Sequence, residues 1–286
     1  MGIVGTGALV AEGAAARSGV AAFNVITLEH AEAIVAGAEA AGRPAILQIS
    51  QNAVRWHAGR IRPIAVAAAS VAQQATVPVS LHLDHVEDRA LLEQATYAGF
   101  SSVMFDAGAL PHDRNIALTA EATAWAHNAG LWVEAELGYV GGKPDQPASA
   151  HAAGVRTDPD EAAAYVAATG VDALAVAVGS SHAMTTRSAR LDTRLVERLR
   201  QAVPVPLVLH GSSGVPDEEL RRAVAAGIVK VNVGTALNLA MTGAVRTVLD
   251  ADSDLVDPRR YLGPAREAIT ATVRAVLDVV AGATAG

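Results

Sequence analysis

The chain of 286 residues contains no cysteine, which excludes disulfide bonds and thiolate chemistry and is typical of cytoplasmic proteins. Aromatic residues make up 3% against 51% hydrophobic residues, so the core must be built mainly from Ala, Val, Leu and Ile. No apolar run is long enough to cross a bilayer, and no basic leader precedes the first apolar residues. Lys and Arg number 22 against 29 Asp and Glu, which argues against a nucleic-acid or anionic-membrane surface. We therefore predict an acidic, globular, cytoplasmic protein without nucleic-acid or membrane partners.

Short apolar segments alternate along the chain with longer, alanine-rich segments of helical pattern. The predicted strands are Ala22–Ile26, Ala45–Ser50, Val79–Leu83, Ser102–Phe105, Trp132–Glu136, Ala173–Val178, Leu207–Leu209 and Val229–Val233. The predicted helices are Leu28–Ala41, Ile61–Gln74, Asp88–Ala98, Asn115–Asn128, Pro159–Ala168, Thr193–Ala202 and Asp217–Ala226. Several of these helices end at a glycine, the usual helix stop.

Eight strand–helix units with apolar strands predict a parallel sheet covered on both faces, and eight such units close into a single (β/α)8 TIM barrel. We expect one domain over residues 1–286, with a long active-face loop at 141–157 and a C-terminal helical tail. The alternative is an open doubly wound sheet, but no Gly-x-Gly-x-x-Gly motif follows the first strand.

Three histidines stand where an apolar strand runs out into a polar or glycine-rich turn. They are His85 in VPVSLHLDHVED, His182 in DALAVAVGSSHA and His210 in VPLVLHGSSG. One histidine at such a place is most often a hydrogen-bonded structural residue. Three of them on one barrel rim match the geometry of a catalytic metal site, and Asp84 precedes the first directly. The pattern therefore predicts a metal enzyme.

Other polar residues also fall at the carboxyl ends of the predicted strands, where barrel enzymes carry their chemistry. These are Ser50, Asp106, Glu134, Glu136 and Asn232. Any one of them is explained by a strand meeting solvent, but that explanation is much weaker for the whole set.

This residue set suggests a reaction. Three neutral imidazoles leave Zn²⁺ an open coordination position, through which the ion can polarise a carbonyl and hold an enolate oxygen. Asp84 cannot easily share the metal geometry of His85 and is free to act as an acid or base. The turns GSSG at 211–214 and NVGT at 232–235 follow two neighbouring strands, at the usual phosphate site of α/β barrels. Together these features describe an aldol reaction on a ketose phosphate.

At these residues the chain resembles the class II, metal-dependent ketose-bisphosphate aldolases, which include fructose- and tagatose-bisphosphate aldolases. The resemblance runs from AFNV at 22–25 through LHLDH, VEAELG, LVLHGSSG and KVNVGT to DPRRYLGPAREAI. It implies a (β/α)8 barrel, a homodimer or homotetramer, a catalytic zinc with room for a second divalent or a monovalent cation, and reversible cleavage to dihydroxyacetone phosphate and an aldehyde.

The resemblance also implies roles for individual residues. His85, His182 and His210 match the metal ligands, and Asp84 matches the proton donor at the aldehyde oxygen. Asp106 and Glu136 match carboxylates that hold a second or displaced metal position. The matches to substrate-binding positions are Ser50, Ala183, Gly211, Ser212, Ser213, Asn232, Val233, Gly234, Thr235 and Arg259. The last of these matches an arginine that reaches the distal substrate phosphate of a neighbouring subunit.

Three departures from the family pattern concern the substrate. Pro144 stands where a loop glutamate usually moves the proton at the nucleophilic carbon, and Asp145 or Glu134 are the candidates to replace it. Ala183 stands where a glycine usually approaches the phosphate, which requires a backbone angle that accepts a methyl group. The segment MTTRSARLD follows in place of a tyrosine-lysine-glycine run.

Two other functions remain open at this point. A non-catalytic, aldolase-like subunit of a sugar-catabolic complex would fit the missing glutamate but has no need of three histidines. A zinc-dependent sugar-phosphate epimerase or isomerase would use carboxylate pairs without cleaving a carbon–carbon bond. We expect the remaining histidines to be non-catalytic: His30, His57, His82, His112, His127 and His151. Of these, only His151, in the long loop, is a candidate to contact the substrate.

Overall fold

The computed structural model describes residues 2–138 and 156–282, and most of the predicted loop at 141–157 lies outside them. Eight parallel strands pair in chain order, and β8 pairs with β1, so the sheet closes into a barrel. The strands are β1 (Val20–Asn24), β2 (Ala45–Ser50), β3 (Val79–Val86), β4 (Ser102–Phe105), β5 (Trp132–Leu137), β6 (Ala173–Val176), β7 (Leu207–Leu209) and β8 (Ile228–Val233). The predicted (β/α)8 barrel is confirmed.

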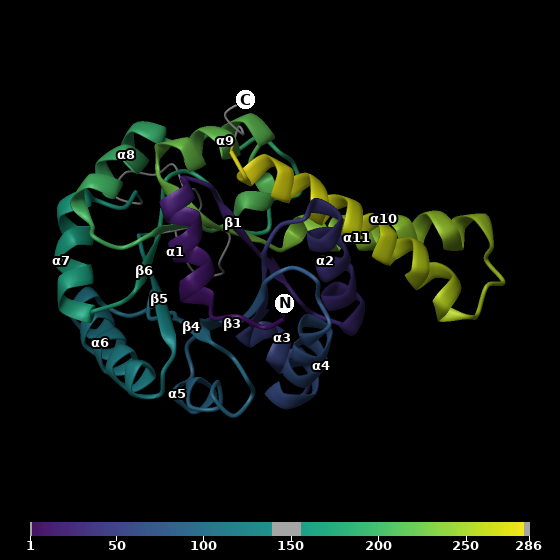
Figure 1. Ribbon diagram of the computed structural model, residues 1–286, viewed down its shortest axis with the longest axis horizontal. Helices are drawn as coiled ribbons and strands as arrows, with labels where there is room; N and C mark the ends of the chain where they lie inside the picture. The colour runs from purple at the N-terminus through teal and green to yellow at the C-terminus, as the bar shows by residue number, and fades with distance from the viewer. Residues whose placement is uncertain (1, 139–155, 283–286) are drawn as a thin grey trace.

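Helices surround the barrel in a ring (Figure 1). They are α1 (Thr6–Ala16), α2 (Leu28–Ala41), α3 (Gln51–Trp56), α4 (Ile61–Gln73), α5 (Arg89–Leu92), α6 (His112–Asn128), α7 (Pro159–Thr169), α8 (Thr193–Ala202), α9 (Asp217–Ala226), α10 (Thr235–Ala251) and α11 (Pro258–Val280), with a short 3₁₀ turn at Ser212–Gly214.

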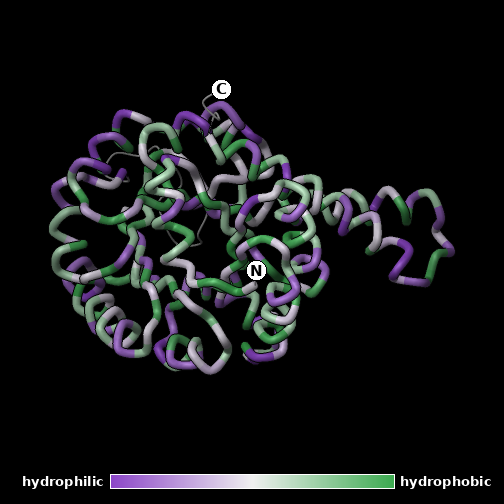
Figure 2. Tube along the Cα trace, viewed as in Figure 1, coloured by the Kyte–Doolittle hydropathy of each residue, from purple (hydrophilic) through white to green (hydrophobic). Residues whose placement is uncertain are grey.

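The two faces of each strand carry different residues, because side chains alternate between the faces. On β3, Leu81 and Leu83 belong to the main apolar core between sheet and helices, whereas Ser80, His82 and Asp84 alternate with them. Hydrophilic residues recur along the outer side of the helix ring (Figure 2). The apolar face of each strand thus packs against the surrounding helices, and the residues of the other face, which point into the barrel, can be polar.

Helix α1 was not predicted, and it lies across the view of the barrel interior in Figure 1. Leu9 and Val10 pack with Val20, Ala22 and Ile46 in a small apolar cluster at the start of the strands. Its sequence, TGALVAEGAAA, shows little amphipathic contrast because both helix faces carry small residues. The helix closes the amino-terminal end of the barrel.

Helices α10 and α11 form a hairpin, called here the arm, that projects from the barrel (Figure 1). The carboxyl-terminal part of α11 returns to the body, where Ile269, Val273 and Leu277 are buried. On the arm, Leu239 and Val256 are exposed. None of the helices within the described ranges is long and apolar enough to span a membrane.

One helix was predicted over too long a segment. Besides α1, two helices of the structure were not predicted, α3 and α10. The segment Asp88–Ala98 is helical only over α5, because i→i−3 bonds such as Gln94 N to Leu91 O (3.1 Å) then tighten the backbone into turns. Short α3 follows β2 directly, and α10 begins at Thr235, directly after Gly234 of the predicted phosphate turn. The helical tail predicted at the end of the chain contains α11.

Candidate metal centre and substrate cavity

The carboxyl end of β3 presents two adjacent side chains to the same cavity, Asp84 and His85. Neighbouring strand residues normally point to opposite faces. Here the pairing of β3 with β4 shifts register between Leu83 and Val86, and His85 adopts a left-handed backbone with φ of 48°. This bulge turns His85 back toward the cavity that Asp84 already faces.

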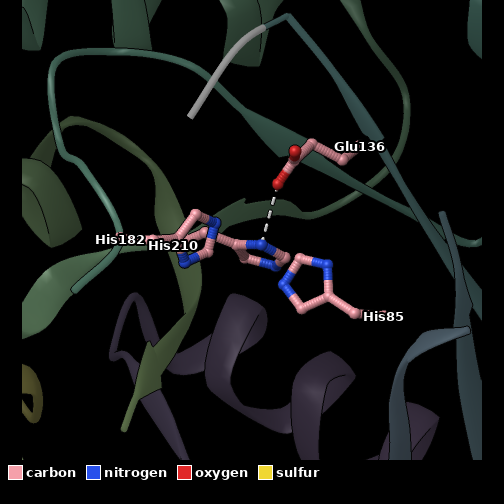
Figure 3. Close-up of side chains that lie close together, drawn as sticks. All are labelled: His85, Glu136, His182 and His210. Atoms are coloured by element: carbon pink, nitrogen blue, oxygen red, sulfur yellow. Dashed lines mark ion pairs between the residues drawn. The ribbon is translucent and has the colours of Figure 1, made fainter. Parts of the chain in front are cut away.

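His85, His182 and His210 converge with Glu136 from four different strand ends (Figure 3). These four residues are called here the metal group. One possible ligand atom from each residue lies within 4.8 Å of the others. The imidazole ring centroids are 5.0 Å apart for His85 and His210, 5.3 Å for His85 and His182, and 5.8 Å for His182 and His210. Three imidazoles and a carboxylate in this arrangement fit a divalent transition metal.

Two of the predicted ligands are held by hydrogen bonds to carboxylates. His85 Nδ1 lies 2.8 Å from Asp106 Oδ2. His210 lies between two glutamates, with Nε2 2.8 Å from Glu134 Oε1 and Nδ1 2.9 Å from Glu136 Oε2. Carboxylates that accept from a ring nitrogen fix the orientation and tautomer of a metal-binding histidine. The chain therefore supplies both the predicted ligands and carboxylates that could orient them.

Burial and charge act in opposite directions on the titratable groups of the centre. Burial alone would lower the pKa of His210, but hydrogen bonds to Glu134 and Glu136 raise this pKa to about 9 in the absence of metal. Burial would raise the pKa of the Asp84 carboxyl, yet the neighbouring His85 and His82 hold that pKa below its ordinary value. Asp84 is therefore ionised at neutral pH, the form in which a carboxylate can act as a proton acceptor.

A cavity of about 530 Å³ opens beside the metal group at the carboxyl ends of the strands. The predicted site residues that line it are Ser50, Asp84, His85, Asp106, His182, Ala183, Gly211, Ser213, Asn232, Gly234 and Thr235. Glu136 and His210 are buried next to it, within the metal group. The structure thus brings together predicted residues that lie far apart in the chain.

The two predicted phosphate turns lie on the same side of this cavity. Gly211 has a positive φ of 66°, and a Cβ there would come within 2.6 Å of the Ser181 backbone, so only glycine fits. Ser213 Oγ accepts a hydrogen bond from Ala236 N at 3.0 Å and so ties the two turns together. Ala183 also has a positive φ, 57°, so it keeps a left-handed conformation that favours glycine.

Three predicted substrate-binding residues are not among those lining the cavity. The Ser212 hydroxyl donates to the Asn232 carbonyl, and the side chain of Val233 packs in the apolar core. Arg259 lies exposed on the arm, where its guanidinium pairs with Asp257 at 2.7 Å. Pro144, Asp145 and His151 lie outside the described residues.

Several of the histidines expected to be non-catalytic have other partners in the described part of the chain. His57 Nε2 lies 2.8 Å from the Ile26 carbonyl, and His127 pairs with Asp172 at 2.9 Å. His82 is buried inside the barrel, where its Nδ1 lies 2.8 Å from Ser102 Oγ. Burial and the Lys230 charge lower the pKa of His82 to about 3.

Several polar residues of the site were not predicted from the sequence. Lys230 is fully buried and contacts Glu134 at 2.7 Å. Asn24, Gln48 and Arg55 line the cavity. Lys230 could have been recognised from the sequence, since a lysine in the middle of the apolar segment IVKVNV requires a buried counter-charge.

Comparisons with known proteins agree with this geometry. A family model described as fructose-bisphosphate aldolase class-II matches residues 4–284. The chain is 38% identical over 274 residues to a fructose-bisphosphate aldolase of Geobacillus stearothermophilus, covering 96% of this chain and 95% of that one. It is 38% identical over 253 residues to a fructose-bisphosphate aldolase of a Staphylococcus epidermidis strain, covering 88% of each. Among solved structures, the YdjI aldolase from Escherichia coli K12 superposes with a TM-score of 0.83 at 30% identity, covering 99% of this chain and 100% of that one.

Proposed function

The chain belongs to the class-II fructose-bisphosphate aldolase family, and we propose that it binds Zn²⁺ through His85, His182 and His210 and cleaves a ketose bisphosphate, such as fructose or tagatose 1,6-bisphosphate, to dihydroxyacetone phosphate and an aldehyde. The observation that carries this proposal is the convergence of the three imidazoles beside a cavity that also holds Asp84. A metal bound there supplies a Lewis acid for the ketose carbonyl. Asp106 and Glu136, both next to these histidines, are our candidates for a second or displaced cation position.

Asp84 is the proposed acid–base group at the bond that breaks. Its Oδ1 atom is buried and has no hydrogen-bond partner in the described ranges. In the cleavage direction the ionised carboxylate accepts the proton of the hydroxyl next to the breaking bond, and that carbon becomes the aldehyde. The electron pair of the carbon–carbon bond passes to the dihydroxyacetone phosphate half. In condensation the same carboxyl returns the proton to the aldehyde oxygen.

The cavity walls suggest an orientation for the substrate. We place the dihydroxyacetone phosphate half against Gly211, Ser213, Gly234 and Thr235, because backbone N–H groups of such turns hold phosphate oxygens. Ser212 and Val233 belong to the same turns and contribute through their backbone. The aldehyde half then lies toward β2 and β3, where Ser50 lines the wall.

The group that moves the proton at the nucleophilic carbon is a separate question. Glu134 is a poor candidate, because it is fully buried and its two oxygens contact His210 and Lys230. We therefore propose that proton exchange on dihydroxyacetone phosphate is slow or depends on Asp145. An Asp145→Ala variant that exchanges this proton with solvent at the parent rate would eliminate that residue.

We further propose a cytoplasmic homodimer or homotetramer in which Arg259 reaches the cavity of a neighbouring subunit. Arg259 lies in the first turn of α11, on the projecting arm, and is not among the residues that line its own cavity, which supports this assignment.

A product assay tests the proposed function. The purified protein, loaded with zinc, is incubated with fructose or tagatose 1,6-bisphosphate, and dihydroxyacetone phosphate is measured through a coupled enzyme. We expect its formation to require the metal. Interconversion of ketoses without cleavage would indicate an epimerase, and the absence of any reaction would favour a non-catalytic subunit.

A further inference from the structure

Lys230 is a fully buried lysine inside the barrel, at the middle of β8. Its ammonium group donates to Glu134 Oε2 at 2.7 Å and to Asn232 Oδ1 at 2.8 Å. Glu134 lies on β5, which is not a neighbour of β8 in the sheet, so the ion pair crosses the barrel interior. A buried ammonium is costly unless it is paired and hydrogen-bonded, and such a group places its partners narrowly.

The first contact leads to the metal centre. Glu134 Oε2 accepts from Lys230, and Oε1 lies 2.8 Å from His210 Nε2. An ionised carboxylate can only accept, so this contact keeps a proton on Nε2. Nδ1 is then the His210 nitrogen left to face the metal group. Lys230 holds Glu134 in the position that orients this ligand.

The second contact leads to the substrate cavity. Asn232 lies two residues beyond Lys230 on the same strand face and lines the cavity. Because Asn232 Oδ1 accepts from Lys230, the amide must present its Nδ2 donor elsewhere. Nδ2 is buried and has no hydrogen-bond partner among residues 2–138 and 156–282, so it is available to a substrate oxygen.

We propose that Lys230 is a positioning residue whose single ammonium group sets two orientations at once, that of the metal ligand His210 through Glu134 and that of the substrate-facing amide of Asn232. This inference rests on the proposed function for the assignment of metal and substrate.

Two binding measurements on four variants test it. Zinc affinity is measured on the metal-free protein with a competing chelator. The affinity for phosphoglycolohydroxamate, a mimic of the enolate of dihydroxyacetone phosphate, is measured with the metal site saturated. Glu134→Gln should weaken zinc binding about 10- to 100-fold, the usual effect of losing a group that orients a ligand, and leave mimic affinity unchanged. Asn232→Ala should leave zinc affinity unchanged and weaken binding of the mimic about 10-fold. Lys230→Met should weaken both.

The fourth variant controls for loss of stability. Tyr165→Phe removes a buried hydroxyl that donates to Asn115 at 2.8 Å, in the α6–α7 layer outside the barrel. It should lower the melting temperature without moving either affinity. A Lys230→Met protein that loses only one affinity, or neither, would overturn the proposal.

Should Lys230→Met not fold, the double variant Lys230→Met/Glu134→Gln removes both buried charges. Compared with Glu134→Gln alone, it should bind the mimic about 10-fold more weakly, and equal mimic affinities would refute the second orientation. These readouts do not require turnover. A parent protein that binds zinc and the mimic but cleaves no ketose bisphosphate would contradict the proposed function. The affinities of the variants would still decide the Lys230 inference.

Discussion

Asp84 and His85 are adjacent in the chain, yet both side chains line the same cavity because His85 takes a left-handed backbone conformation. A regular strand would have sent one of them into the layer between sheet and helices. The bulge therefore allows the proposed acid–base group and a proposed metal ligand to come from consecutive residues. The left-handed conformation costs a non-glycine residue about 1–2 kcal/mol of steric strain, which contacts in the surrounding structure must offset.

Removal of the metal should destabilise the protein as well as inactivate it. Chelation is expected to abolish cleavage and lower the melting temperature, since a ligand that binds only the folded state stabilises it. Zinc should restore both properties. His182→Ala should behave as the chelated protein does, whereas His127→Ala, at an exposed pair with Asp172, should retain the metal. Full activity in the metal-free protein would exclude a metal mechanism.

Replacement of Asp84 should reduce turnover more than binding. Asp84→Asn keeps the shape of the side chain but cannot accept the hydroxyl proton, and we expect kcat to fall by about 10²–10⁴-fold with KM little changed. Metal content measured on the same sample shows whether the ligand set is intact. A near-normal kcat would remove Asp84 from the reaction.

The left-handed conformation of Ala183 predicts a stabilising substitution. Ala183→Gly relieves the steric cost at φ of 57° and loses part of that gain to the greater freedom of the unfolded chain. We expect a net increase of about 0.5–1 kcal/mol in the free energy of unfolding, measured with urea. Ala58→Gly is the matched control, because Ala58 has φ of 56° on an exposed turn away from the cavity. A loss of stability only at position 183 would show that the methyl group makes favourable contacts.

His82 predicts a specific sensitivity to acid. Because the folded pKa is about 3 and the ordinary value is 6.5, the unfolded chain binds a proton at this histidine between these pH values and the folded chain does not. Stability should therefore fall as the pH drops below about 6.5, by at most about 1.4 kcal/mol per pH unit from this group. His82→Asn should give a shallower decline in urea unfolding of the metal-free protein. Parallel curves for parent and variant would mean that His82 is protonated in the folded state.

Arg55 predicts a preference for an anionic aldehyde. It lines the cavity on the side assigned to the aldehyde half, and the ion pair that it makes with Glu87 at 3.4 Å is exposed and weak. Arg55→Met should raise KM for glyceraldehyde 3-phosphate in the condensation direction by about 10-fold and leave KM for glyceraldehyde unchanged. Glu87→Gln should not raise either value. An equal effect of Arg55→Met on both aldehydes would argue for a structural role.

The parts of the site that were predictable are those fixed by strand ends. Parallel strands in a barrel share one carboxyl rim, so His85, His182 and His210 could be brought together without knowing any distance. The residues beneath the rim were not accessible in this way. Lys230 was visible as an anomaly in an apolar strand, but its partner Glu134 comes from a distant strand across the barrel, and no local pattern encodes that pairing. Helix α1 was missed for a related reason, since its contacts with β1 and β2 are tertiary and its own periodicity is weak.

Helix α1 covers the amino-terminal end of the barrel, so we expect metal, substrate and products to pass through the rim at the opposite end, where the cavity opens. A molecule seated in the cavity then stands between the metal and solvent. Bound substrate should consequently slow the exchange of the metal with chelators, and the order in which metal and sugar phosphate are added should affect how fast activity appears. Because the barrel is closed at one end, the metal and the substrate must enter through the same opening, and each can block the other.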